Sequence, residues 1–129
     1  MAAAASLLSD YRRANGLPAV EVDSRLAALA QDQVRRMAAA EKVTHDPGGR
    51  GFLQRLQNVN YNAARAAENV GAGYHTLAEA FSGWRYSPTH NTNMLLPGAT
   101  RFGIATAYSE KSKYKVFWAL LLAEPAAAR

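Results

Sequence analysis

The segment from residue 114 to residue 122 is apolar on both sides when it is read as a β-strand, and this feature restricts the fold most. Side chains alternate between the two faces of a strand. Tyr114, Trp118 and Leu122 fall on one face, and Phe117 is one of the apolar residues on the other. Because both faces must be covered, we expect this strand inside a sheet that has a layer of helices on each side.

Two amphipathic helices are predicted before any strand. In the first, Leu8 and Tyr11 share an apolar face, whereas Arg12 is expected to point elsewhere. Ser6 is expected to cap this helix, and Gly16 to end it. The second helix is predicted to open at Asp23 or Ser24 and to end near Lys42. Its apolar stripe consists of Leu26, Leu29, Ala30, Val34, Met37 and Ala38.

The rest of the chain alternates between turns, short helices and strands. Thr76 and Glu79 form a capping box, which predicts a helix that runs past Trp84. Residues 61–65 are ambiguous. The other expected elements are a loop over Asp46–Arg50, a short helix at Phe52–Leu56, strands at Ala66–Tyr74 and Arg101–Ser109, and a polar turn at Glu110–Lys113.

These elements predict an α+β fold, with a central, mainly antiparallel sheet between two helical layers. We expect a single domain over residues 1–129, with flexible ends near residues 1–5 and 124–129. The net charge of +5 is spread along the chain without a nucleic-acid-binding motif, so no nucleic-acid partner is expected. No apolar run is long enough for a membrane span.

The chain has no cysteine, which excludes disulfides and thiolate metal sites. Its first residues lack the charged and apolar regions of a secretory signal. From the residues alone, either the protein stays inside the cell or a leader has been removed before this sequence begins.

Three separate segments carry the residues best suited to catalysis or ligand binding. Ser87-Pro88 breaks a helical pattern, so His90 is expected on a loop or a short new turn. Glu68 lies in the glycine-rich strand, and His45 follows the second helix. We expect these side chains to converge on one hollow beside the last two strands.

Several motifs in this order resemble one known family. They are N-G-L-P at 15–18, a histidine after the second helix, E-N at 68–69, W-R-Y-S-P-T-H-N-T-N-M-L at 84–95, and a closing hairpin. The set is similar to the CAP superfamily (cysteine-rich secretory proteins, antigen 5 and pathogenesis-related 1), in particular to its short, cysteine-free bacterial type. The resemblance runs from about Leu7 to Leu122 and implies a three-layer α-β-α sandwich.

The resemblance also implies a site. Family members line a cavity with two histidines and two glutamates, which can hold a divalent metal in some members. By position, His45 and His90 match the histidines and Glu68 matches one glutamate. Ser87 stands where the second glutamate is usual. His45 and His90 are therefore candidate ligands of an ion such as zinc, with Ser87 or Asp46 as an outer contact.

Three functions stay open at this point. The first is an exported bacterial protein, secreted or periplasmic, that binds an envelope, lipid or peptide ligand in a cleft lined by His45, Glu68, Ser87 and His90. The second is a metal-assisted peptidase with His45 and His90 as ligands and Glu68 as base. The third is a scaffold domain with a vestigial cavity.

Each site residue also has a structural interpretation. His45 and His90 can be loop histidines hydrogen-bonded to Glu68 and to the backbone. Asn69 is expected to hold irregular backbone, and Trp84 to form core or cavity wall. A Ser87–His90 nucleophilic pair is the least favoured interpretation, because serine before proline is above all a turn signal.

Overall fold

The computed structural model describes residues 2–45, 51–110 and 115–126. The expected loop over 46–50, the turn residues 111–113 and the expected strand residue Tyr114 lie outside the described residues. In chain order the elements are α1 (Ala2–Ala14), β1 (Glu21–Val22), α2 (Ser24–Ala40), α3 (Phe52–Asn58), β2 (Ala63–Ala72), α4 (Leu77–Arg85), α5 (Pro88–Met94), β3 (Arg101–Tyr108) and β4 (Val116–Pro125).

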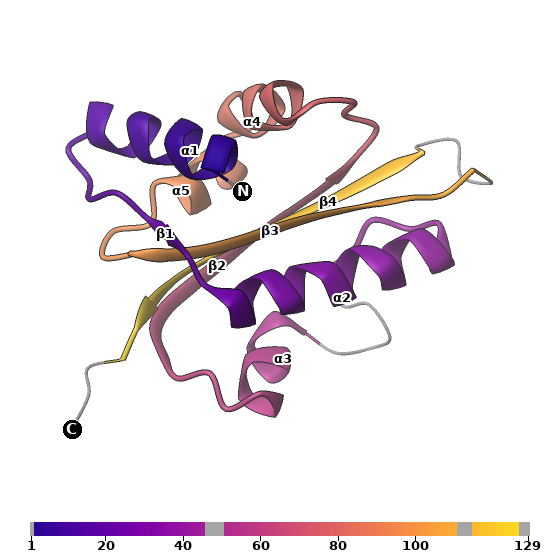
Figure 1. Cartoon of the computed structure of the whole chain (residues 1–129), viewed down its shortest axis with the longest axis horizontal. Helices are drawn as coiled ribbons and strands as arrows, with labels where there is room; N and C mark the ends of the chain where they lie inside the picture. The colour runs from indigo at the N-terminus through magenta and orange to yellow at the C-terminus, as the bar shows by residue number, and fades with distance from the viewer. Residues whose placement is uncertain (1, 46–50, 111–114, 127–129) are drawn as a thin grey trace.

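The strands form one sheet in the order β1-β3-β4-β2. β4 is antiparallel to both of its neighbours, and the short β1 is parallel to β3. Figure 1 shows α1, α4 and α5 on one side of the sheet and α2 and α3 on the other. The predicted α-β-α sandwich with a mainly antiparallel sheet is confirmed. No helix in the described ranges has the length and apolarity that crossing a bilayer requires.

β4 is the centre of the core, as its doubly apolar pattern predicts. Trp118 and Leu120 pack toward α1 and α4, and Phe117 and Leu121 pack toward α2. All four side chains are buried. On neighbouring β3, a Cβ at Gly103 would overlap the backbone of α2, so the absence of a side chain there lets α2 lie directly against the sheet.

Both predicted helix caps on α2 and α4 are present. The Asp23 carboxylate accepts from the backbone N–H of Arg25 and of Leu26 at 2.9 and 3.3 Å. The Thr76 hydroxyl accepts from the N–H of Glu79 at 3.1 Å. These bonds satisfy amides that the first helical turn leaves free.

The first helix and the last strand extend beyond their expected bounds. α1 begins at Ala2, so residues 2–5 are helical and Ser6 lies within the helix instead of capping it. Alanine is the strongest helix former, which explains the early start. β4 continues to Pro125, because β2 also begins early, at Ala63, and pairs with it there. β3 does not extend alongside Pro125, so no neighbouring strand needs the backbone N–H that proline lacks.

Arg12 does not point away from the core as expected, and its side chain is fully buried. Its guanidinium donates to the carbonyl oxygens of Pro18, Met94 and Ala99 at 2.9, 2.9 and 3.0 Å. Leu8 precedes it by one helical turn and is buried too. The covered face of α1 is therefore wider than its apolar stripe.

Candidate functional site

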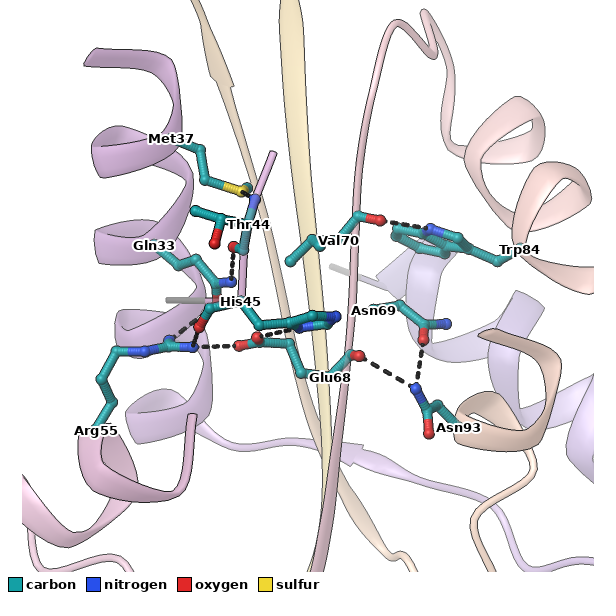
Figure 2. Close-up of polar contacts among 10 residues, drawn as sticks. All are labelled: Gln33, Met37, Thr44, His45, Arg55, Glu68, Asn69, Val70, Trp84 and Asn93. Carbon is teal, nitrogen blue, oxygen red and sulfur yellow. Dashed lines mark hydrogen bonds and ion pairs between the residues drawn. The ribbon is translucent and has the colours of Figure 1, made fainter. Parts of the chain in front are cut away.

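Two adjacent residues of β2 extend the candidate site to both faces of the sheet. Side chains alternate along a strand, so Glu68 points toward α2 and α3 and Asn69 points toward α5. Figure 2 shows this division, with His45 and Arg55 grouped around Glu68 and Asn93 next to Asn69. Both Glu68 and Asn69 are buried.

Glu68 is held by one charged and one aromatic partner. Arg55 of α3 donates to Oε2 at 2.8 Å, and His45 Nδ1 lies 2.8 Å from Oε1. The side chains of Arg55 and Glu68 are only 5% and 2% exposed, so the guanidinium charge offsets the cost of burying the carboxylate. Because the carboxylate accepts, His45 Nδ1 carries a proton, and Nε2 is the ring nitrogen that this contact leaves available.

His45 is fixed at its backbone as well as at its ring. Arg55 donates to the His45 carbonyl oxygen at 3.0 Å and to Gln33 Oε1 at 2.9 Å. Gln33 in turn donates to the carbonyl oxygen of Thr44 at 3.2 Å. The His45 side chain nevertheless stays 55% exposed. This segment therefore presents an oriented imidazole to solvent above a buried, hydrogen-bonded set of polar side chains.

On the other face of the sheet, His90 lies in the seven-residue helix α5. This agrees with its expected place outside a long helix. Its Nδ1 lies 2.9 Å from Ser87 Oγ. Asn69 donates to the His90 carbonyl oxygen at 3.0 Å, and Asn93 donates to Asn69 Oδ1 at 3.0 Å. The two amide side chains thus fasten α5 to β2.

The pKa of His90 is lowered below its usual 6.5, first by partial burial and then by repulsion from a positive charge on His45 whenever that ring is protonated. The structure thus brings His45 to Glu68 by a hydrogen bond, and Ser87 to His90 by another. β2 connects the two pairs, because its Glu68 bonds the His45 ring and its Asn69 bonds the His90 carbonyl oxygen. Asp46, the other expected outer contact, lies outside the described residues.

Trp84 lies at the edge of this region as core, not as an exposed platform. It is buried, and its Nε1 donates to the Val70 carbonyl oxygen at 3.4 Å. Asn93 Nδ2 donates to the Glu68 carbonyl oxygen at 3.2 Å. Side chains from α4 and α5 therefore cap two outward carbonyl groups of β2.

Arg55 and Gln33 are the site residues that the sequence interpretation missed. Both carried a usable signal, because each is a polar residue on an apolar helical face. Arg55 follows Phe52 by three positions and precedes Leu56, and Gln33 lies between Ala30 and Met37. A long polar side chain at such a position indicates a buried partner of opposite polarity.

The donor set fits a divalent ion only incompletely. Both Nδ1 atoms are bonded to oxygen, an arrangement that orients metal-binding histidines and leaves each Nε2 available. Within residues 2–45, 51–110 and 115–126, however, no three His, Cys, Asp or Glu side chains are grouped to hold one ion. Ser87, at the position where the resemblance implies a second glutamate, supplies only a hydroxyl that is already bonded to His90.

The comparisons identify the family. The model of the cysteine-rich secretory protein (CAP) family matches residues 5–122. The chain therefore belongs to the CAP family, although it contains no cysteine. Among curated proteins, no sequence match was found.

Solved structures show the same fold. An outer surface protein of Borrelia burgdorferi has a TM-score of 0.84 at 17% identity, over 94% of this chain and 89% of that one. An extracellular protein of Bacillus anthracis that contains an SCP domain has a TM-score of 0.81 at 22% identity, over 95% of this chain. A cysteine-rich secretory protein of Staphylococcus aureus has a TM-score of 0.74 at 17% identity, also over 95% of this chain. The chain spans 39% and 37% of the lengths of the last two.

Proposed function

We propose that this chain is the binding domain of an exported bacterial protein, and that His45 and His90 recognise a peptide or another polar envelope ligand. The observation that carries the proposal is the exposed His45 ring held on the buried Glu68–Arg55 pair. A buried ion pair that fixes a half-exposed imidazole favours recognition by directed hydrogen bonds. The descriptions of two similar structures as an extracellular and an outer surface protein support export.

A polar ligand fits this site better than a lipid chain. The groups that the site presents are polar: the half-exposed His45 ring on the Glu68–Arg55 pair, and the Ser87–His90 pair. Directed hydrogen bonds to such groups suit a peptide or another polar ligand, whereas a lipid chain is held mainly by apolar side chains.

The geometry supports binding better than peptide hydrolysis. Both oxygens of Glu68 are already engaged, one by His45 and one by Arg55. A proton taken up by Glu68 would cancel the charge that the buried Arg55 guanidinium pairs with. Glu68 is thus better placed to orient His45 than to act as a general base.

Binding to an array of random decapeptides tests the proposal. We expect a subset of peptides to bind the wild-type protein and to lose binding in the double variant His45→Ala/His90→Ala. His75→Ala is the matched control, because it removes an imidazole elsewhere on the chain, just before α4. If the double variant retains the same peptides at the same affinity, the histidines are not the recognition site.

The incomplete donor set leads to a prediction about zinc. His45 Nε2 and His90 Nε2 would hold the ion, which would supply a positive charge for an anionic ligand group. Isothermal titration is expected to show weak zinc binding that His45→Ala abolishes. Ser87→Glu, which adds the missing carboxylate, is expected to tighten zinc binding on the order of tenfold or more. Ser87→Ala is the control. Equal heats in all variants would exclude a zinc site here.

A further inference from the structure

The outer edge of β3 is open over most of its length. β1 pairs with β3 only at Arg101 and Phe102. No strand in the described residues pairs with the remainder of this edge, which is separated by β4 from β2, the strand that carries Glu68 of the His45 site.

The hydrogen bonds of the sheet define which backbone groups face outward. In an antiparallel pair, alternate residues bond the neighbouring strand. Ser109 N–H bonds the Lys115 carbonyl, so the odd-numbered residues of β3 bond toward β4. Phe102 points the other way, because its carbonyl accepts from Asp23 of the β1 segment. The N–H and C=O groups of Ile104, Thr106 and Tyr108 therefore face outward.

The opposite edge of the sheet is protected. On β2, the outward carbonyl groups of Glu68 and Val70 are capped by Asn93 and Trp84. A register irregularity between Ala63 and Arg65 interrupts the start of that strand. Caps and bulges are common devices that prevent strands from pairing with other chains. By contrast, no such caps are found on the outward backbone groups of Ile104, Thr106 and Tyr108 among the described residues.

A cavity borders the middle of this edge. A cavity of about 310 Å³ is lined by Ile104, Ala105 and Thr106 of β3. Side chains of consecutive residues point to opposite faces, so a cavity that touches both Ile104 and Ala105 extends around the edge itself. The other lining residues come from both helical layers and from β4, and are Ala3, Ala4, Gln31, Leu77 and Trp118.

The positive charge around this edge favours an acidic binding partner. Arg35 lies one helical turn beyond Gln31 on α2, so it projects beside the same edge. It is exposed, and no ion pair or hydrogen bond of its side chain is found within the described part of the chain. The N-terminus of α1, at Ala3 and Ala4, adds partial positive charge. No carboxylate is among the lining residues of this cavity.

We propose that the outer edge of β3 binds an extended, acidic peptide segment as an added strand, paired to Ile104, Thr106 and Tyr108 and with a carboxylate near Arg35. Backbone hydrogen bonds supply the affinity in this type of recognition, and side-chain contacts supply the preference. This second site is separate from the His45 site, and it stands whether or not the proposed function holds.

Nuclear magnetic resonance of the ¹⁵N-labelled protein tests the proposal, with the acetylated peptide Val-Thr-Val-Thr-Asp as the probe. We expect the amides of Ile104, Thr106 and Tyr108 to shift and to exchange more slowly with solvent. Arg35→Gln is expected to weaken binding about two- to fivefold. Thr106→Pro removes one outward N–H, a change that edge strands tolerate, and is expected to abolish binding. Thr106→Val keeps that N–H and is expected to bind normally.

A second probe works on the wild-type protein alone. The same peptide with alternate amides N-methylated cannot pair as a strand and is expected not to bind. Equal binding of this peptide, or shifts that map to β2 instead of β3, would overturn the proposal. It would also fail if the β3 amides were already protected in a concentration-dependent manner without peptide, because the occupant would then be a second copy of this chain.

Discussion

Arg55→Met is expected to lower the free energy of unfolding by about 3–5 kcal/mol. The substitution leaves the Glu68 carboxylate buried at 2% exposure without its 2.8 Å ion pair. It also removes donors from Gln33 and from the His45 carbonyl. Removing one partner of a buried pair costs more than the pair itself contributes, because the remaining charge stays desolvated. Urea unfolding followed by circular dichroism measures the change.

Two controls separate this effect from a general loss of charge. Arg36 forms a 2.9 Å pair with Asp32, but both side chains are about half exposed, so Arg36→Met is expected to cost less than about 1 kcal/mol. Glu68→Leu added to Arg55→Met removes the unpaired carboxylate and is expected to recover part of the loss. A loss from Arg55→Met no larger than that from Arg36→Met would contradict the buried-pair interpretation.

Arg12→Met is expected to cost about 3 kcal/mol or more, since it leaves three buried carbonyl groups without a donor. These carbonyls belong to Pro18, Met94 and Ala99, which lie in separate segments. Burial lowers the pKa of Arg12, but three acceptors compensate the charged form by hydrogen bonds. The same unfolding measurement tests this expectation.

Arg13 is the natural control for Arg12, because it is the next residue and its side chain is 62% exposed. Arg13→Met is expected to change the free energy of unfolding by no more than about 0.5 kcal/mol. If Arg12→Met also unfolds at the wild-type urea concentration, the three carbonyl groups find other donors, and Arg12 does not fasten α1 to α5.

Much of the fold could be predicted from local patterns. The doubly apolar segment of β4 required two covering layers, and Asp23 and Thr76 marked the starts of α2 and α4. The first helix was misjudged because only apolar residues were counted as buried. Arg12 follows the buried Leu8 by four positions and therefore shares its face. A long side chain with five donors can take a core position when backbone carbonyls surround it.

The site could be predicted only in part. The order of motifs led to the family, which the family model confirms, and to His45, Glu68, Ser87 and His90 as positions. Which of these residues bond each other depends on the pleat of β2. Glu68 and its neighbour Asn69 face different layers, so His45 and His90 are anchored on different sides. Partners that come from separate layers leave no local pattern in the sequence.

The caps on β2 limit how many copies of this protein could ever stack side by side. A fibril that grows by strand pairing requires two open borders on the sheet of every copy, one for the preceding copy and one for the next. Here Asn93 and Trp84 close one border. Self-pairing through the remaining border is therefore expected to stop at two copies, which would limit fibril growth at high protein concentration.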